Sequence, residues 1–195
     1  MIQRGLVLGG LLLLAAGSWW LLKTLGNEEN LVDNDQTRFL PDYAVVDFTS
    51  THTDDAGQVK YQLQGRLLKH YPVVDTEITA PYLVFYQAGQ PVWYAKAETG
   101  LLSSDGETLH LVGKTLMWRS TEQPDEAVTI VSRDVLVKPT IEYAETAAET
   151  DIETQAGLTQ SRGMRLYMRT QQAELLSAVR GRYVSRSNQR GLSPR

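Results

Sequence analysis

The stretch VKYQLQGRL, residues 59–67, carries the clearest structural signal in this 195-residue chain. Apolar or small residues such as Leu63 and Leu67 occupy every second position, and polar residues such as Gln62 and Arg66 lie between them. Successive side chains of a β-strand point to opposite faces, so this alternation predicts a half-buried strand. The chain therefore contains at least one strand with a single apolar face.

Working outward from this stretch, similar short segments recur from Pro41 onward. They lie at residues 44–49, 82–86, 91–98, 109–111, 116–118, 128–130, 135–137, 141–143 and 166–168. Ser104-Asp105-Gly106 and Ser161-Arg162-Gly163 read as turns between them. About ten to fourteen short antiparallel strands, spaced by about 8–12 residues, predict an all-β meander, sandwich or barrel.

The stretch from Gln171 to Val179 contains no residue that breaks secondary structure, so it has the propensity of a helix. An alternation with a period of two is also present, and it extends beyond the stretch. It places four residues on one face, namely Ala173, Leu175, Val179 and Tyr183. A strand is favoured over the helix.

The N-terminus carries an uncharged run from Leu6 to Leu22, at the short end of what spans a bilayer as a helix. Arg4 precedes the run, which places the N-terminus in the cytoplasm by the positive-inside rule. A cleaved signal peptide ending near residues 15–17 is the alternative. The predicted organisation is a cytoplasmic stub and anchor over 1–26, a linker over 27–40, a β domain over 41–185 and a disordered tail over 186–195.

Composition excludes several classes of function. The net charge of −4 does not suggest a nucleic-acid partner. The chain has no cysteine, and its three histidines lie far apart, so neither a metal nor a cofactor is expected. The run from Ser50 to Asp54 contains a nominal triad, but neighbouring residues of a strand point to opposite faces and are not expected to converge.

An acidic stretch is the remaining place to look for chemistry. Its carboxylates are Glu142, Glu145, Glu149, Asp151 and Glu153. Paired carboxylates serve glycosidases, but this spacing is more typical of a solvated, alternating sheet face. No catalytic residue is predicted, and the chain is not expected to be an enzyme.

Two longer patterns resemble a known family. Trp93–Leu101 leading into Leu109–Gly113 resembles the strand pair of the lipopolysaccharide-transport β-jellyroll families. Thr150-Asp151, Gly157 and then Ser161–Met164 resemble the C-terminal signature of the LptC family of membrane-anchored lipopolysaccharide export proteins. The order of the other features, from the anchor to the final strand, agrees with this family.

The resemblance covers about residues 1–185 and implies an open, twisted β-jellyroll after one N-terminal transmembrane helix. It implies a non-enzymatic component that receives lipopolysaccharide from an inner-membrane ABC transporter and passes it to a soluble periplasmic jellyroll protein. The chain would cross the inner membrane once, with its C-terminal domain in the periplasm. The alternatives are an anchored adaptor that binds only protein and, less favoured, an anchored hydrolase.

Three groups of residues are the candidate sites. Residues on the apolar side of an alternating pair or in an apolar run are expected to line a lipid channel: Phe48, Leu63, Ile78, Val84, Leu109 and Val137. Gly57, in the first hairpin turn, is expected to support docking to the transporter. Ala173, Leu175, Val179 and Tyr183 are expected to form the edge that accepts the soluble partner.

Overall fold

The computed structural model describes residues 15–23, 40–121 and 127–183. Residues 15–23 form a helix, and a separate compact unit begins at Pro41. Within these described ranges, no helix has the length and apolar character needed to cross a membrane. Most of the predicted anchor and linker, and all of the predicted tail, lie outside the described residues.

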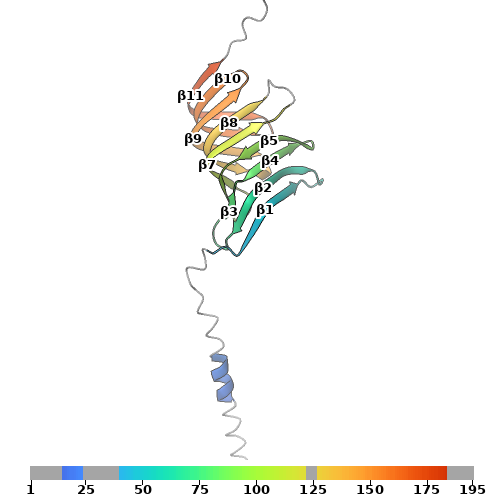
Figure 1. Ribbon diagram of the computed structural model, residues 1–195, viewed down its shortest axis with the longest axis vertical. Coiled ribbons are helices and arrows are strands. Elements are labelled where there is room, and N and C mark those ends of the chain that lie inside the picture. Colours follow the sequence, from blue (N-terminus) through green and yellow to red (C-terminus); the bar gives the residue numbers. More distant parts are fainter. Residues whose placement is uncertain (1–14, 24–39, 122–126, 184–195) are drawn as a thin grey trace, which may run out of the picture. The chain divides into compact units, whose positions relative to one another are not determined.

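The unit that begins at Pro41 is one continuous antiparallel sheet (Figure 1). Its strands are β1 (Tyr43–Thr53), β2 (Val59–His70), β3 (Thr76–Thr79), β4 (Tyr82–Gln87), β5 (Gln90–Lys96), β6 (Thr99–Leu102), β7 (Leu109–Arg119), β8 (Val128–Lys138), β9 (Tyr143–Thr154), β10 (Gly157–Tyr167) and β11 (Gln172–Tyr183). A short 3-10 helix, η3 (Pro139–Ile141), connects β8 to β9. The all-β prediction is therefore confirmed.

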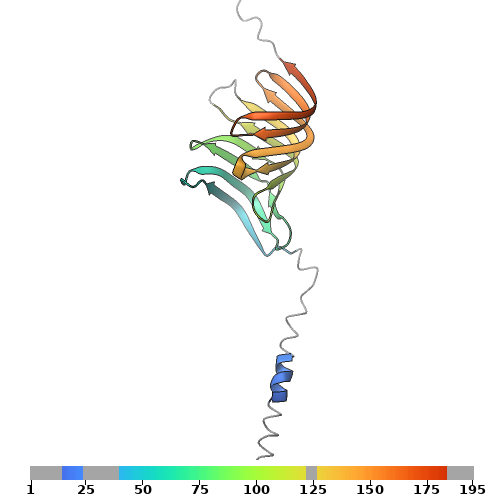
Figure 2. The same cartoon turned by 180° about the vertical axis from the view of Figure 1, so that it is seen from behind.

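The sheet curls into two layers because its long strands change partners along their length. The first part of β2, residues 61–64, pairs with β4, and its last part, residues 67–69, pairs with β3. In the same way β7 pairs with β6 through residues 109–112 and with β5 through residues 116–119. We call the two halves the β4–β5 layer and the β3–β6 layer; β7 to β11 run through both (Figure 2).

A left-handed backbone residue lies at the bend of five of the long strands. These residues are Asp47, Gly113, Asp134, Gly163 and Ala178, with φ angles of 48°, 75°, 49°, 83° and 51°. The Gly113 amide donates a hydrogen bond of 2.7 Å to Asp134 Oδ1, which ties the bends of β7 and β8 together. Such residues redirect a strand sharply, as in a β-bulge, and register shifts occur at this level between β7 and β11.

These bends correct the prediction of many short strands. Residues 109–111 and 116–118 belong to one strand, β7, and residues 128–130 and 135–137 belong to β8. Ser161-Arg162-Gly163 is a bend inside β10 and not a turn between strands. The physical reason is that a left-handed residue changes the direction of a strand without ending its pairing. The last strand, β11, is a strand and not a helix, as predicted.

The core fills the space between the two layers. Its largest fully buried side chains are Phe85, Ile78, Leu83, Leu109, Leu111, Met117, Ile130, Met164, Leu166, Met168, Val135 and Val137. They come from β3, β4, β7, β8 and β10 and from the residue that follows β10, so strands of both layers contribute. Burial of this apolar surface stabilises the fold by about 25 cal/mol per Å².

Edge strand β1 is fixed to the core through Phe48. Phe48 pairs with Gly65 on β2, and a Cβ atom at Gly65 would lie 2.7 Å from both the Phe48 ring and the Ile78 side chain. The absence of a side chain at Gly65 therefore creates the space in which the Phe48 ring packs beside Ile78. The other large apolar residues of β1, Tyr43, Val45 and Val46, are exposed.

Replacing this glycine is expected to release β1. Gly65→Val places methyl groups where the Phe48 ring and Ile78 lie, and overpacking of this kind costs about 1–3 kcal/mol. Urea unfolding should show the loss, and hydrogen exchange should show faster exchange along β1. Arg66→Val, at the exposed neighbouring position, is the control and should change neither. Unchanged β1 protection in Gly65→Val would contradict the proposed packing role.

Candidate binding site between the two layers

The structure brings five of the six predicted channel residues together between the layers. Leu63, Ile78, Leu109 and Val137 belong to the buried core cluster, and Phe48 packs against it while remaining partly exposed. They come from β1, β2, β3, β7 and β8, which are distant in sequence. The arrangement is an apolar interior shared by both layers.

Val84 is the exception. Its neighbours Leu83 and Phe85 belong to the core cluster, so alternation places Val84 on the opposite face of β4. There it pairs with Gln62 on β2 and Tyr94 on β5. Val84 is buried, but on the outer face. The inward prediction is corrected because the run YLVFY is apolar at every position and does not indicate a face.

A row of buried hydroxyl groups crosses the interior near the bends, and no pattern in the sequence indicated it. Thr115, Ser132, Thr150 and Ser161 lie at paired positions on β7 to β10 and are at most 6% exposed. Ser132 Oγ lies 2.9 Å from Thr150 Oγ1 and donates to the Glu149 carbonyl at 3.0 Å. The hydroxyls thus satisfy backbone carbonyls near the bends, where the regular ladder is interrupted.

On the side away from the bends, the two layers meet along what we call the seam. The β4–β5 layer contributes the β1–β2 turn (residues 54–58) and the β4–β5 turn (88–89), and the β3–β6 layer contributes η3 and the β10–β11 turn (168–171). Lys60 Nζ donates to the Thr140 carbonyl at 3.0 Å, and Gln87 Nε2 donates to the Met168 carbonyl at 3.4 Å. Among the described residues, no strand pairing crosses the seam.

Tyr61 also reaches the seam from the edge of the core. Burial raises the pKa of its phenol, and a hydrogen bond with Thr140 offsets part of that effect. The phenol is therefore protonated at neutral pH. Its ring stacks on His52 of β1, with ring centroids 4.4 Å apart. Tyr61 thus connects edge strand β1 with the seam.

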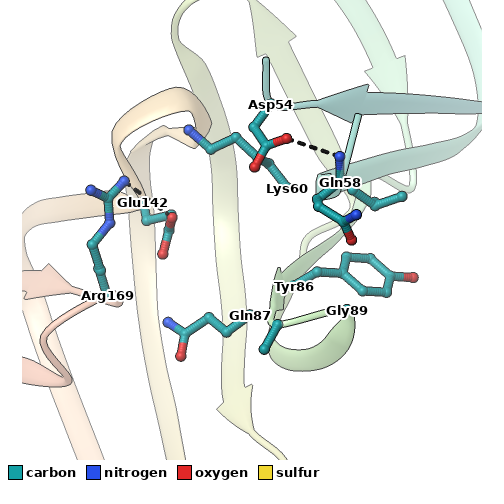
Figure 3. Close-up of a pocket in the computed structure, with 10 residues that line it drawn as sticks. Asp54, Gln58, Lys60, Tyr86, Gln87, Gly89, Glu142 and Arg169 are labelled. Atoms are coloured by element: carbon teal, nitrogen blue, oxygen red, sulfur yellow. Dashed lines mark hydrogen bonds and ion pairs between the residues drawn. The ribbon is translucent and has the colours of Figure 1, made fainter. Parts of the chain in front are cut away.

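A cavity of about 450 Å³ opens at the seam (Figure 3). Glu142 and Arg169 line it from the β3–β6 layer, and Asp54, Lys60 and Gln87 line it from the β4–β5 layer.

Only 7% of Glu142 is exposed, although the acidic stretch was predicted to be solvated. Glu142 follows η3 with a φ of 55°, a left-handed conformation that separates it from the regular alternation of β9. The other four acids of the stretch are partly or fully exposed.

Two residues of the nominal triad, Ser50 and His52, lie close together on β1, although the three were not expected to converge. Ser50 Oγ and His52 Nε2 lie 3.4 Å apart, because residues two apart in a strand share a face. Asp54 does not complete a triad, since its Oδ1 accepts hydrogen bonds from the backbone amides of Ala56 and Gln58. Within the described part of the chain, no group of histidine, aspartate and glutamate residues is placed to hold a metal ion.

Edge strands β1 and β11 lie at opposite ends of the folded unit (Figure 1). Within the part of the chain that the structure describes, β1 pairs only with β2, and β11 pairs only with β10. Gly57, in the turn beside the β1 edge, has a φ of 77°, as its predicted turn role requires.

On β11, Leu175 packs against the core, whereas Val179 and Tyr183 are 53% and 73% exposed. A register shift opposite Ala178 interrupts the alternation, so Ala173 and Leu175 do not share one continuous face with Val179 and Tyr183.

A bent antiparallel sheet with an apolar interior and a strand at each end that pairs on one side only is a β-jellyroll-like fold. The chain belongs to the LptC-related family of lipopolysaccharide-assembly proteins, whose family pattern matches residues 10–184. It is a component of lipopolysaccharide transport. No curated protein matches the sequence.

Among solved structures, the chain is similar to LptH, the LptA-homologous periplasmic component of the lipopolysaccharide transport device from Pseudomonas aeruginosa. The TM-score is 0.40 and the sequence identity 11%, with 82% of this chain and 92% of that chain covered.

Removing one hydroxyl of the buried row is expected to destabilise the bend. Ser132→Val leaves the Glu149 carbonyl and Thr150 without their partner, which costs about 1–3 kcal/mol. Thr129→Val, on the outer face of the same strand, is the matched control. Chemical denaturation should show a lower free energy of unfolding for the first variant only; equal stability of the two variants would show that these hydrogen bonds do not support the bend.

Proposed function

We propose that this protein receives lipopolysaccharide from an inner-membrane ABC transporter and passes it to a soluble periplasmic jellyroll protein. The acyl chains would be shielded between the two layers during the transfer. An N-terminal transmembrane helix over residues 6–22 would hold the chain in the inner membrane, with its N-terminus in the cytoplasm and the folded domain in the periplasm.

The apolar interior is the observation that carries this proposal. Moving an acyl chain from an apolar environment into water costs about 0.8 kcal/mol of free energy for every methylene group. The cost for a chain of about twelve carbons is therefore about 10 kcal/mol. An interior lined by side chains such as Leu63, Ile78 and Leu109 offsets that cost without any covalent chemistry. Transfer then needs only a continuous apolar path from one protein to the next.

The packing of the interior sets a condition on this function. Ile78, Leu109 and Val137 have no exposed surface, so acyl chains reach them only when the layers move apart. The seam is where separation costs least, because among the described residues side-chain hydrogen bonds such as those from Lys60 and Gln87 cross it and no strand pairing does. Each contributes about 0.5–1.5 kcal/mol. The bends would remain as the hinge.

The two unpaired edges supply the docking surfaces in this proposal. β1, beside the Gly57 turn, would join the transporter, and β11 would accept the first strand of the soluble partner. Strand addition extends the sheet by backbone hydrogen bonds, and alternate side chains set the register. The exposed Val179 and Tyr183 would then contact the strand that the partner adds.

A second candidate is an anchored adaptor that binds only protein partners. The complete burial of Ile78, Leu109 and Val137 favours it, since a closed interior needs no ligand for stability. The two candidates differ in whether the interior ever contacts lipid. Covalent capture from an inner position therefore distinguishes them.

A photoreactive phenylalanine analogue at Phe48 is expected to capture lipopolysaccharide in cells. Phe48 points into the interior and is partly exposed, so the aromatic analogue fits with little disturbance. Tyr82, a partly exposed aromatic residue on the outer face of β4, is the matched control and should capture none. Immunoblotting for lipopolysaccharide adducts gives the result. Protein adducts alone at Phe48 would favour the adaptor.

Truncation should separate the two docking edges. Deleting residues 171–195 removes β11 and is expected to abolish binding of the soluble partner in pull-downs while transporter binding persists. Deleting residues 186–195 should change neither. Gly57→Val should weaken transporter binding while binding of the soluble partner persists. A β-branched residue tolerates the φ of 77° poorly, so this substitution should distort the turn beside the β1 edge.

The deletion also exposes β10, so a second variant keeps β11 in place. Val179→Lys combined with Tyr183→Lys adds charges to the exposed edge, which discourages strand addition. It should also lose the soluble partner. Retention of that partner by both the truncation and the double variant would show that β11 is not its docking edge.

A further inference from the structure

Glu142 at the seam has an unsatisfied carboxylate oxygen. Its Oε1 lies 3.3 Å from Arg169 Nη2, but its Oε2 is buried and has no hydrogen-bond partner among the described residues. Leaving a buried acceptor without a hydrogen-bond donor is unfavourable, because the group has lost water and gained nothing in its place. Figure 3 shows the carboxyl group directed into the cavity, between Arg169 and the facing layer. A ligand that donates a hydrogen bond there would remove this cost.

Other residues that line the cavity can offer a ligand both hydrogen-bond donors and a hydrogen-bond acceptor. Lys60 uses one ammonium hydrogen for the Thr140 carbonyl, which leaves two for a ligand. The Arg169 side chain is 64% exposed, so its remaining donors are accessible. Gln87 donates its amide to Met168 and keeps its carbonyl oxygen as an acceptor. The site therefore suits a ligand that carries both donors and anionic acceptors.

Size and position restrict the ligand further. The volume of about 450 Å³ falls in the range of about 300–1,000 Å³ usual for small-molecule sites. The cavity is adjacent to the interior, because Met168 accepts the Gln87 hydrogen bond through its backbone and places its side chain in the core. A polar group bound in the cavity would therefore lie at the entrance through which attached acyl chains enter.

We propose that the seam cavity binds the phosphorylated amino-sugar headgroup of the lipid whose acyl chains enter the interior. Sugar hydroxyl or amide groups donate to Glu142 Oε2, and a phosphate accepts from Lys60 and Arg169. This inference rests on the proposed function and names the polar half of its substrate.

The test uses the full chain in detergent and a water-soluble probe, the glucosamine disaccharide bisphosphate obtained by complete deacylation of lipid A. Calorimetric titration should show binding that is about tenfold weaker for the dephosphorylated disaccharide. Inorganic phosphate at the same concentration should not displace the probe. Equal affinity for the two disaccharides, or full displacement by inorganic phosphate, would overturn the headgroup assignment.

Variants assign the binding to the cavity. Glu142→Gln keeps the size of the side chain but removes the carboxylate, and should weaken probe binding about tenfold. Glu145→Gln is the control; Glu145 lies on β9 near Arg165, at 3.9 Å, away from the cavity, and should bind the probe as the wild type does. Equal loss in both variants, or no loss in Glu142→Gln, would place the probe elsewhere.

Lipid capture at Phe48 distinguishes failure of this inference from failure of the proposed function. Capture of lipopolysaccharide at Phe48 by a chain that does not bind the probe would overturn the headgroup site and leave the acyl-chain function standing. Probe binding that depends on Glu142, together with reduced capture at Phe48 in Glu142→Gln, supports both. Absence of capture at Phe48 in the wild type overturns the function on which the inference rests.

Discussion

The bend shared by the long strands is the constraint on which the rest of the structure depends. A left-handed residue in each of β1, β7, β8, β10 and β11 turns one continuous sheet into two layers. The interior exists because the inner faces of those layers oppose each other, and the seam exists because the strands end on the other side. The buried hydroxyl row satisfies backbone groups near the bend. Fold, interior and opening therefore share one cause.

The bend side and the seam side of the jellyroll are held together by different interactions. Continuous strands cross the bend, so separating the layers there requires breaking backbone ladders. At the seam, side chains such as Lys60 and Gln87 reach across to backbone carbonyls. A protein that admits acyl chains needs this asymmetry, because the apolar interior has to open without unfolding. The polar cavity at the seam matches the other half of an amphipathic ligand.

Alternation predicted the strands and most of the interior, since period two follows directly from strand geometry. It failed where the backbone leaves that geometry. Gly113 and Gly163 are visible in the sequence as bend signals, whereas Ala178 is not, because its conformation is imposed by pairing with β10. Val84 lies in a run without polar neighbours, and η3 turns Glu142 inward. Both positions depend on tertiary contacts that alternation does not encode.

Methyl NMR tests the central claim, that the interior shields acyl chains, most directly. The chain is labelled at the isoleucine and methionine methyl groups and loaded with lipopolysaccharide. Intermolecular NOEs are expected from acyl methylenes to Ile78, Ile130 and Met117, which are fully buried, and none to Ile141, which is 60% exposed. NOEs confined to Ile141, or none to the buried methyl groups in the loaded protein, would contradict it.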